Sequence, residues 1–76
     1  MFEVSFERSN GEEIILETVS TMEKAYNSIN KFLEDHNYES HYMRQWYDKT
    51  KDKLKIDVGS WSEFFYIKNL DGKPVD

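Results

Sequence analysis

One segment of this 76-residue chain has the spacing of an amphipathic helix, and segments that alternate like β-strands lie on both sides of it. Apolar residues recur three or four positions apart and form one stripe: Met22, Ala25, Tyr26, Ile29, Phe32 and Leu33. The run Ser20-Thr21-Met22-Glu23 matches a capping box with Ser20 as the N-cap, and we expect the helix to end near His36. A single helix can cover only one face of a sheet.

Strand patterns occupy most of the remaining sequence. Residues 2–7 alternate strictly between apolar and polar side chains, and Asn10-Gly11, a favoured pair for tight turns, separates them from a second strand at 13–19. Three more strands are expected at 39–47, 54–58 and 64–68, with a polar turn at 48–53. The sequence therefore predicts an α+β fold in the order β-β-α-β-β-β. We expect one domain over 1–76, with an ordered core at about 2–68 and a flexible tail at 69–76.

The alternation also assigns side chains to the two faces of the sheet. The face toward the helix would carry Phe2, Val4, Phe6, Leu54, Ile56, Val58, Phe65 and Ile67. The opposite face would carry Glu3, Glu7, Lys55, Asp57, Phe64 and Tyr66. If Tyr42 and Trp46 also point that way, the second face holds an aromatic patch with charged residues around it.

Aromatic residues are numerous for a domain of this size, since 12 of the 76 residues are Phe, Tyr or Trp. A small domain can bury only a few large side chains, and exposed rings are good anchors for protein contacts. Our candidate protein-binding rings are Tyr42, Trp46, Trp61, Phe64 and Tyr66. The alternative is that Trp46, Trp61, Phe64 and Tyr66 form a second small core beneath the C-terminal tail, through Leu70 and Val75.

Charge is unevenly distributed along a chain whose net charge is −5. The N-terminal hairpin is acidic, and we expect Glu3, Glu7, Glu12 and Glu13 to form a surface that steers a partner. The alternatives for this hairpin, which also carries Glu17, are a solubilising face and a mimic of nucleic-acid phosphates. A basic segment follows later, with Arg44, Lys49, Lys51, Lys53 and Lys55. Together with Tyr42 and Trp46 it could bind nucleic acid by stacking bases, although the acidic balance disfavours phosphate binding.

The sequence offers little that points to catalysis or cofactor binding. The chain has no cysteine, no Gly-rich phosphate loop and no Gly-x-Ser-x-Gly element. His36 and His41, with nearby carboxylates, could bind zinc or act as acid and base. A histidine at a helix C-terminus more simply complements the helix dipole. We therefore predict no enzymatic activity, no cofactor and no metal site.

The expected cellular location of the protein follows from its apolar runs, its N-terminal segment and its lack of cysteine. We find no apolar run of the roughly 20 residues that a membrane-spanning helix needs. We also find no secretory signal at the N-terminus. The lack of cysteine fits a reducing cytoplasm. The sequence therefore predicts a cytoplasmic protein that does not act at a membrane.

In size, acidic balance, lack of cysteine and an Asn/Lys/Glu/Tyr-rich composition, the whole chain resembles small phage- and prophage-encoded proteins of Gram-positive bacteria. That resemblance implies an inhibitor that binds a host protein or nucleoprotein complex in the bacterial cytoplasm, as anti-CRISPR proteins do. We therefore predict a non-catalytic protein-binding module. Nucleic-acid binding and self-association into a homodimer through the aromatic face are the alternatives.

Overall fold

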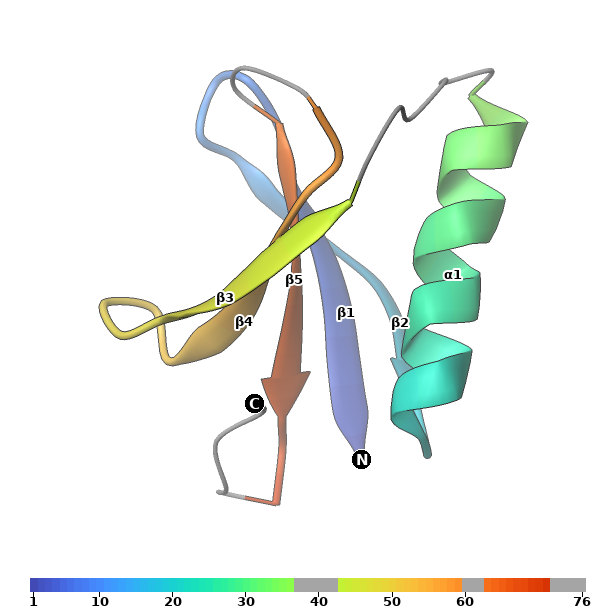
Figure 1. The fold of residues 1–76 in the computed structure, drawn as a ribbon, viewed down its shortest axis with the longest axis vertical. Coiled ribbons are helices and arrows are strands. Elements are labelled where there is room, and N and C mark those ends of the chain that lie inside the picture. Colours follow the sequence, from blue (N-terminus) through green and yellow to red (C-terminus); the bar gives the residue numbers. More distant parts are fainter. Residues whose placement is uncertain (37–42, 60–62, 72–76) are drawn as a thin grey trace.

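The computed structural model describes residues 1–36, 43–59 and 63–71 and shows a five-stranded antiparallel sheet with one helix on one face (Figure 1). The elements are β1 (Phe2–Glu7), β2 (Glu13–Val19), α1 (Met22–Asp35), β3 (Arg44–Asp48), β4 (Lys53–Asp57) and β5 (Phe64–Asn69). This confirms the predicted α+β class and the order β-β-α-β-β-β. The strand expected at 39–47 begins at Arg44, and residues 39–42 lie outside the described residues.

The strands lie in the order β2-β1-β5-β4-β3, so β2 and β3 form the two edges of the sheet. The β1–β2 turn is at the predicted position. Gly11 has a φ of +89°, a conformation that favours glycine, and the Asn10 side chain accepts a hydrogen bond of 2.9 Å from the Glu12 amide. These local bonds fix the hairpin and with it the register of the edge strand.

An irregularity between β1 and β2 determines which side chains of β2 face the helix. Val4 lies opposite Glu17, whereas Ser5 lies opposite Ile15, so Leu16 is an extra residue in β2. A bulge of this kind interrupts the alternation of the strand. Up to the bulge, Leu16 packs against the core and Ile15 lies opposite Ser5 on the face away from the helix; after it, Val19 lies opposite Phe2 and is buried in the core.

The core lies between the helix and the sheet, and it confirms the predicted assignment of the helix-facing residues. Fully or nearly buried apolar residues there are Val4, Val19, Ala25, Ile29, Leu33, Leu54, Ile56, Val58, Phe65 and Ile67, with Phe2 and Phe6 packed against them. The Phe6 ring lies 4.7 Å from that of Phe32 and 5.0 Å from that of Phe65, centre to centre. Contacts at these distances are favourable for aromatic pairs and join the helix to β1 and β5.

The helix starts one residue later than the capping box predicted. Thr21, not Ser20, is the N-cap, because its backbone is extended and its hydroxyl accepts a hydrogen bond of 3.1 Å from the Lys24 amide. A capping box needs a Glu or Gln three residues after the N-cap. With Thr21 as the N-cap that residue is Lys24, so Glu23 does not form the reciprocal hydrogen bond. The Ser20 hydroxyl instead lies 3.3 Å from the Lys24 ammonium.

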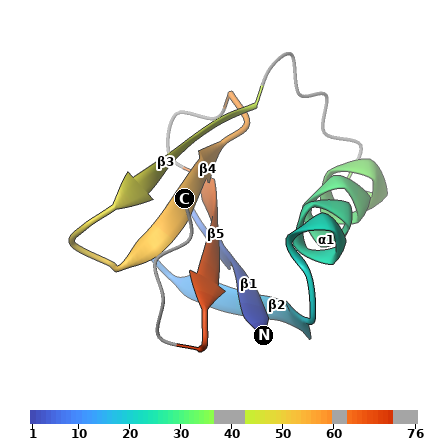
Figure 2. The same cartoon turned by 60° about the horizontal axis from the view of Figure 1, so that its bottom comes forward.

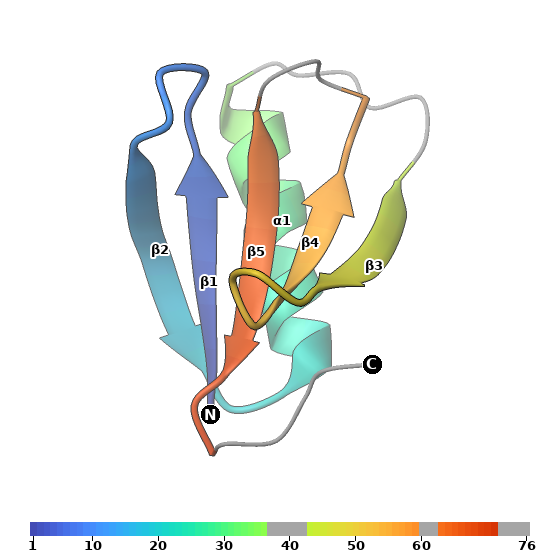
Figure 3. The same cartoon turned by 90° about the vertical axis from the view of Figure 1, so that its left-hand side faces the viewer.

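The β3–β4 hairpin bends toward the face of the sheet opposite the helix. Figure 2 shows the hairpin projecting from the sheet, and Figure 3 shows its turn in front of β5 on the side away from α1. Asp52, within this turn, has a positive φ of 55°. The hairpin therefore covers part of the face that the single helix leaves free.

The end of β5 is attached to the start of β1. Asn69 is part of β5, the Leu70 amide donates a hydrogen bond of 2.9 Å to the Met1 carbonyl, and the N-terminal ammonium lies 2.8 Å from the Asp71 carboxylate. Of the segment expected to be a tail, residues 69–71 thus pair with or contact the sheet, and residues 72–76 lie outside the described residues. In the described part of the chain, no helix has the length and apolar character needed to cross a membrane.

Candidate protein-binding surface

The centre of the face opposite the helix is a buried tyrosine. Tyr66 lies between Ser5 of β1 and Lys55 of β4 in the strand register, and Lys55 lies opposite Trp46 of β3. The exposed fraction of Tyr66 is 0%. The ammonium groups of Lys51, Lys53 and Lys55 lie 4.7, 5.8 and 5.8 Å from the centre of its ring. The aliphatic parts of lysine side chains can cover an apolar ring in this way.

Our expectation that Tyr66 is an exposed contact residue is therefore wrong. The alternation of β5 placed it correctly on the face away from the helix, but the β3–β4 hairpin covers that position. The burial of Tyr66 agrees in part with the alternative of a second small core, but Trp46 and Leu70 of that alternative are 43% and 46% exposed, and Trp61 and Val75 lie outside the described residues.

Carboxylates from the N-terminal hairpin complete the polar shell around this tyrosine. Lys51 lies 2.5 Å from a Glu7 oxygen and Lys53 lies 2.5 Å from a Glu13 oxygen. The Ser5 hydroxyl donates to the same Glu13 oxygen at 2.7 Å. The Tyr66 hydroxyl donates to Glu7 at 3.3 Å. We call these residues the Tyr66 cluster: Ser5, Glu7, Glu13, Lys51, Lys53, Lys55 and Tyr66.

The environment of the Tyr66 cluster shifts the pKa values of three groups. Burial raises the pKa of Tyr66 above its usual value, and the negative charge of Glu7 adds to the effect. The hydrogen bond to Glu7 raises the pKa of Lys51. For Glu13, burial acts to raise the pKa, but the hydrogen bonds from Lys53 and Ser5 and the charges of Lys53 and Lys51 outweigh it and leave the pKa lowered. All three shifts favour the charge states that hold the cluster together.

Several cations of the basic segment are paired with carboxylates or lie over aromatic rings. Lys51 and Lys53 pair with carboxylates of the N-terminal hairpin. Arg44 lies 3.1 Å from the Asp57 carboxylate. Lys55 lies over aromatic rings. Phosphate binding depends on unneutralised cations, so this arrangement weighs against the nucleic-acid alternative.

An exposed aromatic surface lies next to the Tyr66 cluster. Trp46, on edge strand β3, is 43% exposed, and Phe64 is half-buried on β5. The Lys55 ammonium lies 4.0 Å from the centre of the Phe64 ring and 6.0 Å from that of Trp46. We call Arg44, Trp46, Lys55 and Phe64 the Trp46 patch. Tyr42 and Trp61, the other two predicted rings, lie outside the described residues.

The four predicted acidic residues have different surroundings. Glu7 and Glu13 are part of the Tyr66 cluster, where they neutralise lysines. Glu3 is half-buried. Glu12 is exposed over 59% of its side chain and lies 3.8 Å from Arg8. Glu12 is therefore the member of this set best placed to meet a partner.

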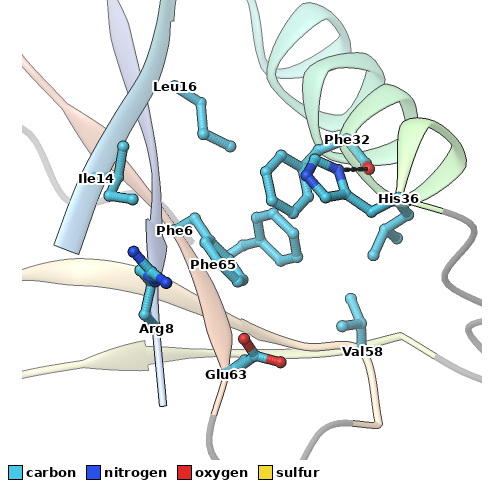
Figure 4. Close-up of a pocket in the computed structure, with 10 residues that line it drawn as sticks. Phe6, Arg8, Ile14, Leu16, Phe32, His36, Val58, Glu63 and Phe65 are labelled. Atoms are coloured by element: carbon cyan, nitrogen blue, oxygen red, sulfur yellow. Dashed lines mark hydrogen bonds between the residues drawn. The ribbon is translucent and has the colours of Figure 1, made fainter. Parts of the chain in front are cut away.

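An apolar cavity of about 440 Å³ lies between the C-terminal end of the helix and the sheet (Figure 4). It is lined by Phe6, Ile14, Leu16, Phe32, Leu33, Val58 and Phe65, with Arg8, His36 and Glu63 as its polar members. The sequence analysis did not find this cavity or the exposure of Ile14 and Ile15. Adjacent residues of a strand point to opposite faces. Two adjacent isoleucines in the strand at 13–19 therefore indicated that one of them lies on the face away from the helix.

His36 has a structural role at the end of the helix. Its Nδ1 lies 2.9 Å from the Phe32 carbonyl oxygen, and its ring stacks on that of Phe32 at 4.1 Å between centres. His41, the other histidine of the metal alternative, lies outside the described residues. Within the described ranges no three histidine or acidic side chains gather as a metal site would require.

Comparisons of the chain with protein-family models, with curated proteins and with solved structures find no match.

Proposed function

We propose that this protein is a non-catalytic module that binds another protein, and that the Trp46 patch is part of the contact surface. The observation that supports this most directly is the exposure of Trp46 on an edge strand, beside the half-buried Phe64. Tryptophan and arginine are over-represented among residues that dominate binding energy at protein interfaces. Both occur here within one short strand.

The surroundings of Trp46 favour its use as an anchor. The patch lies on β-strands, and within it the Lys55 ammonium lies over the rings of both Phe64 and Trp46. Arg44 is held by Asp57 at 3.1 Å. Side chains held in place before binding lose less conformational entropy when a partner arrives. The patch thus offers a partly ordered apolar surface with cations beside it.

A more specific form of this proposal is an inhibitor of phage type, which blocks a host protein or defence complex by occupying its surface. It is supported by the resemblance in size and composition, and by the net charge of −5, which would speed association with a basic partner. Self-association through the Trp46 patch is the second candidate, favoured by the same exposed ring.

The test is affinity capture from a bacterial lysate with the full chain as bait. Wild type is compared with Trp46→Ala and with the matched control Leu70→Ala. Leu70 is 46% exposed, so both variants remove an exposed apolar side chain, and each is first checked for folding by circular dichroism. The proposal predicts a stoichiometric protein that is retained by Leu70→Ala and lost by Trp46→Ala. Capture of nucleic acid released by moderate salt, with no protein partner, would contradict it.

A further inference from the structure

Edge strand β2 exposes two large apolar side chains. Ile15 is 62% exposed and Ile14 is 38% exposed. Ile14 lies opposite Phe6 in the register and so points to the helix side, whereas Ile15 lies opposite Ser5 on the other side. β2 pairs with β1 along one edge, and no strand of the described residues pairs with its other edge. An unpaired edge with apolar side chains is a template for another strand.

The apolar cavity extends to this edge. Ile14 and Leu16 of β2 both line it, together with Phe6 and Phe32 (Figure 4). Paired strands lie about 4.8 Å apart, so a strand added beside β2 would place a side chain next to Ile14 at the cavity. Main-chain bonds to an edge strand provide affinity, and pockets beside it provide selectivity.

Carboxylates lie on both sides of the two isoleucines. Glu12 is exposed and has only a long pairing of 3.8 Å with Arg8. Glu17 is exposed and accepts a hydrogen bond from the Ser28 hydroxyl, and among the described residues no ion pair includes it. Each of these residues is two positions from an isoleucine. A strand that pairs with β2 would therefore meet a negative charge on either side of its apolar contacts.

We propose that β2 binds an extended segment of a partner protein as a sixth strand, with the pattern basic–x–apolar–apolar–x–basic. The two adjacent apolar residues of the segment lie beside Ile14 and Ile15, on opposite faces of the sheet. The two basic residues lie beside Glu12 and Glu17, since opposite charges on paired strands are favourable.

A second copy of this chain fits the edge less well. A β2 strand from a second copy would bring its own Glu12 and Glu17 to an edge that already carries these carboxylates, and it has no basic residue between positions 12 and 19. Like charges directly opposite one another destabilise paired strands. The charge of the edge thus selects a basic strand from another protein.

This inference rests on the proposed function, but it uses a surface distinct from the Trp46 patch. Its test is the selection of a random decapeptide display library on the full chain, followed by titration of synthetic winners. The variants are Ile15→Lys, the conservative control Ile15→Val and Trp46→Ala. Ile15 is mostly exposed, so none of its substitutions removes a core contact. Amide hydrogen exchange, measured by NMR, locates each bound peptide.

The proposal predicts selected peptides with two adjacent apolar residues between basic residues, and slower amide exchange within residues 13–19 on binding. Ile15→Lys should weaken binding about tenfold or more, because it replaces an apolar contact with a charge near the basic residues, whereas Ile15→Val and Trp46→Ala should bind like wild type. Peptides without this pattern, or winners that bind Ile15→Lys as tightly as wild type, would overturn the proposal. A concentration-dependent dimer that is seen by sedimentation and abolished by Ile15→Lys would also overturn the proposal. None of these results depends on whether Trp46→Ala loses the partner captured from the lysate.

Discussion

Lys53, the first residue of β4, places its ammonium 2.5 Å from the carboxylate of Glu13, the first residue of β2. Two other strands, β1 and β5, lie between them in the sheet. Three strand spacings amount to about 14 Å, so the contact spans the face of β1 and β5 above Tyr66. A pair separated by 40 residues in sequence thus joins the N-terminal hairpin to the β3–β4 hairpin.

The pair formed by Glu13 and Lys53 should contribute to stability. Glu13→Gln would leave the ammonium of Lys53, a side chain that is only 16% exposed, without its counter-charge. We expect the free energy of unfolding to fall by about 1–2 kcal/mol, between the values for surface and buried pairs. Urea unfolding measures it. The matched control is Glu12→Gln, whose side chain is 59% exposed and which should change stability by less than about 0.5 kcal/mol. Equal losses in the two variants would refute the structural role of Glu13.

Burial of Tyr66 gives two measurable consequences. Tyr66→Ala should lower the free energy of unfolding by about 3–5 kcal/mol, because it leaves a cavity under the hairpin. Tyr66→Phe should cost only about 1 kcal/mol, the contribution of one hydrogen bond. A loss of under about 1 kcal/mol in Tyr66→Ala would mean that the tyrosine is not covered in solution.

The raised pKa of Tyr66 predicts its behaviour in alkaline solution. A tyrosine whose pKa is higher in the folded than in the unfolded state contributes stability below the unfolded pKa of about 10. That contribution is lost as pH rises through the folded pKa. Spectrophotometric titration should therefore show a tyrosine step above the usual pKa of about 10, and this late step should be missing from Tyr66→Phe. A titration of Tyr66→Phe with the same late step would contradict the assignment.

Stability in acid should depend on Asp57 as well as Glu13. The hydrogen bond from the Gly59 amide lowers the pKa of Asp57, and Arg44 adds to the effect against the opposing influence of burial. A carboxyl with a lowered folded pKa contributes stability that is complete above its unfolded pKa of about 4 and is lost as pH falls through the folded pKa. Thermal unfolding between pH 2 and 7 should show this decrease, and Asp57→Asn should show a smaller one. An unchanged pH profile in Asp57→Asn would contradict the prediction.

The N-cap can be tested with two adjacent substitutions. Thr21→Ala should lower the free energy of unfolding by about 1 kcal/mol, because it removes the acceptor for the Lys24 amide. Ser20→Ala removes only a contact with the exposed Lys24 ammonium, so its effect should be close to zero. Chemical denaturation of both variants decides between the two residues. A larger loss for Ser20→Ala would restore the predicted capping box.

Local patterns were sufficient to predict most of the fold. The strict alternation of residues 2–7, the Asn10-Gly11 turn and the helical stripe each depend on neighbours in sequence, and each is found close to its predicted position. The N-cap was misplaced by one residue because Ser20 and Thr21 are both good caps. The extended backbone at Thr21 and the hydrogen bond that its hydroxyl accepts from the Lys24 amide distinguish them.

The candidate site was harder to predict because it depends on contacts between distant residues. Alternation put Tyr66 on the free face of the sheet, but its burial results from Lys51 and Lys53 of a hairpin that bends over it. Pairing of these lysines with Glu7 and Glu13 spans 44 and 40 residues. The exposure of Ile15 follows from its place opposite Ser5, on the face away from the helix, whereas the bulge that brings Val19 into the core was not indicated by any short pattern. For Trp46 the sequence left open an exposed contact residue or a member of a second core, and the structure places it on edge strand β3 with 43% of it exposed.

The most direct test of protein binding is amide hydrogen exchange of the full chain, with and without the partner captured from the lysate. We predict slower exchange in β3 and β5 around Trp46 and Phe64, and in β2 if the partner also supplies a strand. Protection confined to the outer face of α1, around Glu23, Asn27 and Lys31, with β3 and β5 unchanged, would contradict the account.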